Sequence, residues 1–171
     1  ANKSKKTDQT IAGLVAKIEP SRLKDSLVRL AKFKTRWSYS SDIAKVPEWI
    51  HAQLESLGYP APNETRYQEF DIPGGGRHRN VLGGVTSQGT GFVLLSAHYD
   101  SLSEKPETVA PGVDDNASGI AVLLEVARII RGVSLKRKTL FAAFGGEEQG
   151  LFGSAACAEI AAQQGWPIDV V

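Results

Sequence analysis

The 171-residue sequence predicts an α/β fold of three layers, α/β/α, in which helices cover both faces of a mostly parallel central sheet. Short, continuously apolar segments such as "GFVLLSAH" and "KTLFAAFGG" are typical of strands buried on both faces. They alternate with the longer apolar segments "ASGIAVLLEVARIIRG" and "LFGSAACAEIAAQQG", which predict the covering helices. The final "PIDVV" predicts the start of a further strand.

The first third of the chain predicts helices. Residues 8–18 read as helical, and residues 21–34 place apolar side chains three or four positions apart, on one helix face. A third helix is expected to begin at a cap formed by Ser41 or Asp42 and to end at Gly58. This part should therefore lie against the sheet rather than within it.

Residues 64–72 alternate between apolar and polar side chains, as in a strand, and "PGGG" then predicts a turn. The glycines of "GGGRHR" are expected at a hairpin or loop tip, because no phosphate-loop pattern accompanies them. We expect residues 1–171 to belong to one domain, with a helical part at 1–62 and a sheet-forming part at 63–171.

Composition excludes several classes of partner. Twenty basic and nineteen acidic residues leave a formal charge of +1, which gives no indication of nucleic-acid binding. No apolar run reaches the ~18–20 residues of a membrane span. The lone Cys157 has no partner for an internal disulfide, and its small-residue surroundings predict a packed thiol rather than a nucleophile.

Three groups of polar residues follow apolar segments or precede a helix. Because ligands bind outside the carboxyl ends of parallel strands, we expect these groups to converge at one edge of the sheet. They are His98 with Asp100, Asp114 with Asp115, and Glu147 with Glu148.

Each group has more than one interpretation. The alternation of a strand places His98 and Asp100 on one side. His98 would bind a metal there, and Asp100 would either orient the imidazole or bind the metal as well. The alternative is a surface histidine beside an aspartate in a turn. Asp114 and Asp115 are also candidates for capping the following helix. The adjacent Glu147 and Glu148 would repel each other unless a cation lay between them. In the extended segment expected here, their side chains point to different sides. Imidazole with carboxylates favours zinc, with manganese or cobalt as substitutes.

The segments "LLSAHYDS", "APGVDDNASGIAVLLEVAR" and "TLFAAFGGEEQGLFGS", in this order, resemble the co-catalytic di-zinc aminopeptidase family that includes the secreted bacterial leucyl aminopeptidases. The resemblance also covers "RWSYSSDIAKVPEWIHAQLESLGY", and so most of the chain after about residue 30. It implies the fold of the zinc exopeptidases and removal of N-terminal residues from peptides by a zinc-activated water.

The resemblance also implies a role for each site residue. His98 would bind one of two zinc ions and Glu148 the other, with Asp115 bridging them. Glu147 would be the general base, and Asp100 would orient His98. The peptide bond that follows Asp115 is expected to be cis.

Two further ligands of the family, an aspartate and a histidine, have no match. Asp169 is expected before the last strand rather than after it, and His51 and His78 are expected in a helix and a loop. We therefore expect the chain to be the N-terminal part of a longer enzyme, truncated at its C-terminal side. In isolation it should bind zinc weakly and be nearly inactive.

Other interpretations remain open. The chain would otherwise be a non-catalytic binding module of the same fold, or a di-metal carboxypeptidase or glutaminyl cyclase. Its expected partners are a peptide with a free N-terminus and, over the open sheet edge, the missing C-terminal segment or another copy of the chain. A secreted or periplasmic location is expected by analogy with the bacterial relatives.

Overall fold

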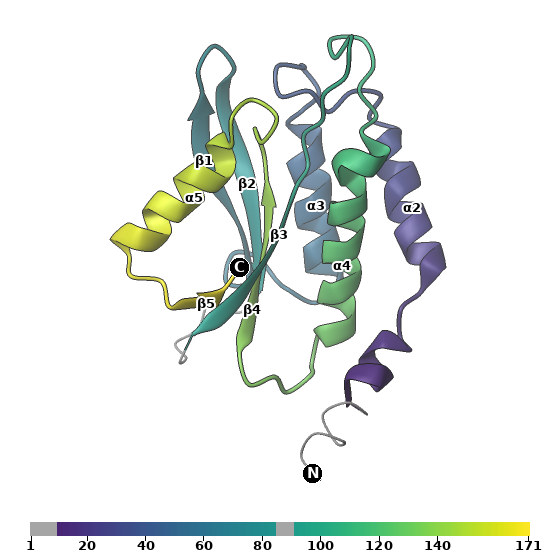
Figure 1. Ribbon diagram of the computed structural model, residues 1–171, viewed down its shortest axis with the longest axis vertical. Coiled ribbons are helices and arrows are strands. Elements are labelled where there is room, and N and C mark those ends of the chain that lie inside the picture. Colours follow the sequence, from purple (N-terminus) through teal and green to yellow (C-terminus); the bar gives the residue numbers. More distant parts are fainter. Residues whose placement is uncertain (1–9, 85–90) are drawn as a thin grey trace.

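The computed structural model describes residues 10–84 and 91–171, and it contains a five-stranded sheet with helices on both faces (Figure 1). The strands are β1 (Thr65–Ile72), β2 (Gly76–Gly84), β3 (Phe92–His98), β4 (Lys138–Phe144) and β5 (Ile168–Val170). Their order across the sheet is β1-β2-β4-β3-β5. The β1–β2 and β2–β4 pairs are antiparallel, whereas β3 is parallel to β4 and β5. The α/β class is confirmed, and parallel pairing is confined to β3, β4 and β5.

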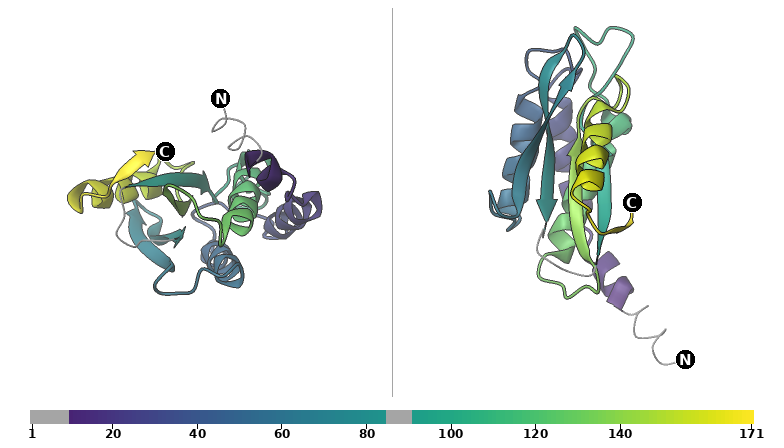
Figure 2. Two further views of the ribbon diagram at one scale, coloured as in Figure 1. Left: turned by 90° about the horizontal axis from the view of Figure 1, so that it is seen from below. Right: turned by 90° about the vertical axis from the view of Figure 1, so that its left-hand side faces the viewer.

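Helices form the two outer layers. They are α2 (Pro20–Ala31), α3 (Lys45–Ser56), α4 (Ser118–Ile130) and α5 (Phe152–Gln163). Helices α3 and α4 cover one face of the sheet, and α2 packs outside α4 (Figures 1 and 2). Helix α5 lies on the opposite face, against β1 and β2. The predicted α/β/α layering is therefore present.

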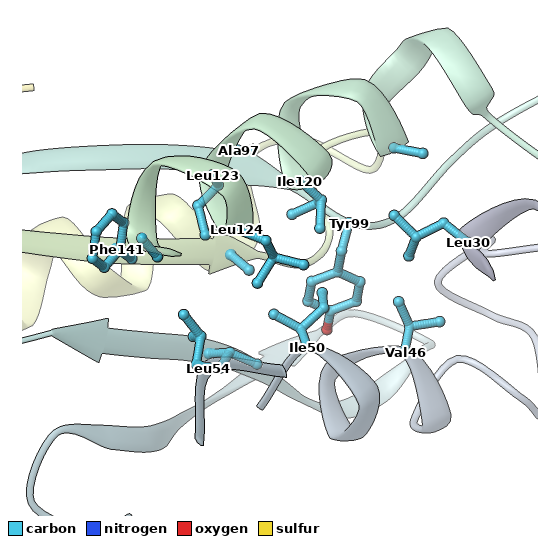
Figure 3. Close-up of a cluster of buried hydrophobic side chains, with 14 of the residues drawn as sticks. Leu30, Val46, Ile50, Leu54, Ala97, Tyr99, Ile120, Leu123, Leu124 and Phe141 are labelled. Atoms are coloured by element: carbon cyan, nitrogen blue, oxygen red, sulfur yellow. The ribbon is translucent and has the colours of Figure 1, made fainter. Parts of the chain in front are cut away.

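The larger hydrophobic core lies between the sheet and the helices of the α3 and α4 layer. Leu30 of α2 and Ile50 of α3 meet Leu123 of α4 and Phe141 of β4 there, all nearly inaccessible to solvent (Figure 3). Side chains from both parts of the chain, before and after residue 62, thus share one core. The ring of Tyr99 lies in the same cluster (Figure 3). Its neighbours His98 and Asp100 instead contact each other at 3.6 Å, as expected for residues on one side of a strand.

A smaller core lies under α5. Leu82, Leu94 and Leu140 of the sheet pack with Cys157 of this helix. Cys157 is buried, and burial raises the pKa of its thiol, opposed by Gln68 and Arg66. The prediction of a packed thiol at this position is confirmed.

The N-terminal helices differ from expectation mainly at their starts. The helix predicted over residues 8–18 is observed over residues 10–15, and residues 8 and 9 lie outside the described part. The predicted cap at Ser41 or Asp42 is wrong, because α3 begins at Lys45 after an N-cap without a side-chain hydrogen bond. Oδ1 of Asp42 instead accepts a hydrogen bond from Lys45 Nζ at 2.7 Å. The predicted end is confirmed at Gly58, which has a φ of 94°.

Two residues of the sheet region also lie elsewhere than predicted. The "PGGG" turn does join β1 and β2 as a hairpin, but His78 is buried within β2 rather than in a loop. Asp169 lies inside β5 rather than before it, where it forms an ion pair with Arg137 at 2.7 Å. Within residues 10–84 and 91–171, no helix has the length and apolar character needed to cross a membrane.

Candidate metal centre

The three predicted polar groups meet at the carboxyl ends of β3 and β4. The two strands are parallel and in register from Phe92 opposite Lys138 to His98 opposite Phe144, so both end at the same edge of the sheet. Nε2 of His98 lies 3.0 Å from Oδ1 of Asp115 and 3.8 Å from Oε2 of Glu147. The predicted convergence of distant segments is therefore present.

His98 is held with one ring nitrogen toward the protein and the other toward the carboxylates. Nδ1 lies 3.2 Å from the backbone oxygen of Asp100 and 3.6 Å from its Oδ1. A proton on Nδ1 would be donated to that backbone oxygen, which leaves Nε2 as the metal-binding atom. The His98 side chain is only 12% exposed, so its orientation is fixed by packing as well as by this contact.

The acidic surroundings change the pKa of His98. Burial is the largest single effect and lowers the pKa, but contact with Asp100 and the charges of Asp100, Glu147 and Asp115 together raise it to about 8. An imidazolium at this point is stabilised by the same negative charges that would attract a metal cation.

Asp100, which was predicted to orient His98, also contacts residues of other segments. Its carboxylate is fully buried and accepts hydrogen bonds from the backbone N–H groups of Glu147, at 3.2 Å, and Glu148, at 3.1 Å. The hydroxyl of Ser38 donates to the same carboxylate at 3.4 Å. Asp100 thus joins the end of β3 to the segment that follows β4.

Glu147 and Glu148 lie in a turn rather than in the extended segment expected from the sequence. The turn follows Gly146, which has a φ of 68° that favours glycine. As a result both carboxylates reach the same side, and one atom each of His98, Glu147 and Glu148 lie within 4.8 Å of one another. Burial, followed by the charge of Asp115, raises the pKa of Glu148, opposed by His98.

Asn80 fixes the base of this turn and was not identified from the sequence. This buried residue of β2 accepts a hydrogen bond from Gly145 N at 3.1 Å and donates to Gly153 O at 2.7 Å. It also donates to Gln68 at 2.9 Å. The sequence signal was a polar residue in the apolar run "RNVLGGV", but its partners Gly145 and Gly153 lie more than sixty positions away.

The loop before α4 brings Asp115 to the site. Its side chain is 75% exposed, and the Asp115–Asn116 peptide bond is cis, as expected. Asn116, rather than either aspartate, accepts from Gly119 N at 2.9 Å in the first turn of α4. Among the described residues, Asp115 is not part of the three-residue donor cluster, although it contacts His98 directly.

The donor atoms suit zinc in type and spacing. Zinc binds imidazole nitrogen and carboxylate oxygen at about 2.0–2.2 Å, so two of its ligands lie at most about 4.4 Å apart. The cluster of His98, Glu147 and Glu148 is close to that size. The donor atoms therefore lie close enough together to border a zinc site.

Comparisons with known proteins identify relatives for most of the chain. Residues 80–171 match peptidase family M28. A probable zinc metalloprotease from Pyrenophora teres f. teres is 29% identical over 176 residues, covering 86% of this chain and 36% of that protein. Leucine aminopeptidase 1 from Ajellomyces capsulatus is 28% identical over 156 residues, covering 84% of this chain and 39% of that protein. The chain thus spans well under half of the length of these curated relatives.

Solved structures share the fold. LapB from Legionella pneumophila has a TM-score of 0.79 at 25% identity, covering 94% of this chain and 44% of that one. A glutaminyl cyclase from Fimbriiglobus ruber has a TM-score of 0.74 at 20% identity, covering 91% of this chain and 60% of that one. This likeness shows a shared fold and nothing more.

The fold and the cluster of nitrogen and oxygen donors define an α/β protein with a candidate metal-binding site. With more than half of its residues matched, the chain belongs to peptidase family M28.

Proposed function

We propose that the protein is a zinc-dependent aminopeptidase, which removes N-terminal residues from peptides. One observation carries this proposal: His98, Glu147 and Glu148 place donor atoms within 4.8 Å of one another, inside the residues that match the peptidase family. A relative named leucine aminopeptidase supports a preference for apolar N-terminal residues.

His98, Asp115 and Glu148 are the proposed metal ligands. Two zinc ions are proposed, with His98 on one, Glu148 on the other and Asp115 between them; manganese or cobalt would substitute. When bound, zinc supplies Lewis acidity that lowers the pKa of a water molecule and polarises the substrate carbonyl. The location of Asp115, 3.0 Å from His98 Nε2, supports its assignment.

Glu147 is the proposed general base. Its Oε2 lies 3.8 Å from His98 Nε2, and its side chain is partly exposed, so it borders the metal ligands and remains accessible to water. Glu147 would take a proton from the attacking water and deliver it to the leaving amine. Asp100 would hold Glu147 and Glu148 through their N–H groups and keep the His98 ring in place.

The excess of carboxylates suits a substrate with a free amino group. An ammonium group needs an anionic partner near the metal ligands, and the carboxylates around His98 supply negative charge there. Each zinc needs one further protein ligand beyond these residues. We propose that a segment outside residues 1–171 supplies it and covers the β5 edge, so that the isolated chain binds zinc weakly.

Glutaminyl cyclase activity is the second candidate, because a glutaminyl cyclase shares this fold. The two activities differ in product. An aminopeptidase releases a free amino acid from a leucine amide substrate, whereas a cyclase closes an N-terminal glutamine and releases ammonia. Assay of both substrates with the same preparation decides between them.

The proposed mechanism is tested by Glu147→Gln in the protein expressed from its complete gene. The rate of leucine amide hydrolysis should fall by a factor of about 10²–10⁴, the usual contribution of a general base. Glu159→Gln on the exposed side of α5 is the matched control and should keep the wild-type rate. A full rate in Glu147→Gln would exclude the proposed base.

A further inference from the structure

Arg36 is a fully buried cation in the segment between α2 and α3, outside the residues that match the peptidase family. Arginine is almost never fully buried unless its donors are paired. Arg36 has no ion pair closer than 4 Å among the described residues; backbone oxygens accept its hydrogen bonds instead. The location of these oxygens indicates what the side chain does.

The guanidinium of Arg36 joins two of the segments that carry the metal-binding residues. Nε donates to the backbone oxygen of Tyr99 at 2.7 Å, between His98 and Asp100 in the sequence. Nη1 donates to Pro111 O, and Nη2 donates to Gly112 O at 2.9 Å, three residues before Asp115. One rigid, planar group therefore sets the distance between the end of β3 and the loop that leads to α4.

The backbone around Arg36 lies between the same two segments. Arg36 N donates to Ala110 O at 3.3 Å, and Ser101 N donates to Arg36 O at 3.1 Å. Thr35 and Ala110 form a parallel β-bridge. Main chain and side chain thus hold Arg36 in one orientation, so its donors are preorganised toward the three oxygens.

Gly112 provides the space for this contact. Its φ is 45°, and a Cβ atom there would lie 2.9 Å from Nη2 of Arg36 and 2.4 Å from the backbone oxygen of Asp115. Any side chain at position 112 would push the guanidinium and the Asp115 loop apart. The sequence "PGVDD" therefore fits the buried arginine as well as the turn.

The segment that carries Glu147 and Glu148 is connected to Arg36 through Asp100. This carboxylate accepts the N–H groups of Glu147 and Glu148, and the preceding residue, Tyr99, is held by Arg36. Burial lowers the pKa of Arg36 to about 10, and the charge of Asp100 opposes that shift, so the guanidinium stays charged at neutral pH.

We propose that Arg36 is a positioning residue of the metal centre: through three backbone oxygens and Asp100 it fixes the relative placement of His98, Asp115 and the Glu147–Glu148 turn. This inference rests on the proposed metal site but concerns a residue that touches neither metal nor substrate. Lysine at this position would keep the charge but not the planar fork that reaches three oxygens.

Arg36→Lys in the 171-residue chain tests the inference with two measurements. In the metal-free chain, amide hydrogen exchange at Glu147 and Glu148 should accelerate, while exchange within the β1–β2 hairpin stays as in the wild type. Zinc titration against a chromophoric chelator should show a Kd raised about 10- to 100-fold, as for other groups that orient metal ligands.

Ile50→Val is the control for a general loss of stability, because Ile50 of α3 is fully buried in the larger core and its apolar side chain donates no hydrogen bond to the site. It should leave both measurements unchanged. Gly112→Ala is the second variant, in case Arg36→Lys does not fold. Its added methyl group would press against Nη2 of Arg36 and so disturb the hydrogen bond between Arg36 and Gly112. Amide exchange at Glu147 and Glu148, more than thirty residues away in sequence, should again accelerate.

Wild-type exchange at Glu147 and Glu148 in either variant would overturn the inference. So would wild-type zinc affinity in Arg36→Lys, or an equal loss of affinity in Ile50→Val. A wild-type chain that binds no zinc would instead contradict the proposed metal site. The exchange measurement would still decide whether Arg36 positions the turn.

Discussion

Asp100 Oδ2 accepts a hydrogen bond from the backbone N–H of Glu148 at 3.1 Å, with no solvent access to the carboxylate. The paired bond from Glu147 N to Oδ1 makes the carboxylate a two-point clamp. A buried carboxylate is costly unless its oxygens are hydrogen-bonded, and these two N–H groups satisfy one oxygen each. The clamp therefore stabilises the fold and places both glutamates beside His98.

Asp100→Asn should weaken this clamp. The amide keeps one acceptor oxygen but turns an N–H₂ group toward the second backbone donor, and an unpaired buried donor costs about 1–3 kcal/mol. Urea denaturation of the metal-free chain measures the loss. Asp71→Asn, at an exposed ion pair with Arg77, is the matched control and should change stability by less than about 1 kcal/mol. Equal stability of both variants would contradict the clamp.

The raised pKa of His98 predicts a pH dependence of stability in the metal-free chain. The folded chain holds this proton up to about pH 8, whereas the unfolded chain releases it near the ordinary value of 6.5. The folded state therefore binds more protons in this window, and stability falls as pH rises. The shift corresponds to about 2 kcal/mol, present below pH 6.5 and lost above pH 8.

Urea denaturation at several pH values, with a chelator present, measures this slope. His98→Gln removes the titrating group and should flatten the curve between pH 6.5 and 8. Gln163→Ala, on the exposed end of α5, removes no titrating group and should leave the slope unchanged. A slope that persists in His98→Gln would assign the effect to another group.

Asn80 supports the Glu147–Glu148 turn from below, and Asn80→Ala should destabilise the chain. The substitution leaves the buried N–H of Gly145 without its partner, at about 1–3 kcal/mol for an unpaired donor, and removes the hydrogen bond to the oxygen of Gly153. Gln163→Ala on the exposed end of α5 should stay within about 0.5 kcal/mol of the wild type. Thermal and urea unfolding give both values; a neutral Asn80→Ala would show that the turn forms without this support.

The sequence was informative where a structural feature depends on local pattern. The spacing of apolar residues predicted α2 and α4, and the continuous runs predicted β3 and β4. Because β3 and β4 are parallel neighbours, the polar residues after each strand could be placed at one edge before their distances were known. This reasoning predicted that His98 lies near Glu147 and Glu148, as the structure shows, while their roles stay a prediction.

Features that depend on distant partners were not predictable in the same way. The role of Arg36 depends on backbone oxygens at Tyr99, Pro111 and Gly112, and backbone atoms have no sequence signature. The antiparallel insertion of β2 beside β4 depends on which strand edges remain free once β3 has paired. The turn at Glu147 was expected to be extended because the position of Asp100, which holds it, was not known.

The central claim is that His98 and Glu148 belong to one zinc centre. Anomalous diffraction at the zinc absorption edge, from crystals of the protein expressed from its complete gene and grown with zinc, tests it most directly. We expect a peak about 2.0–2.2 Å from Nε2 of His98, with oxygens of Asp115 and Glu148 bound in the same centre. Zinc bound only elsewhere, with none beside His98, would contradict the account.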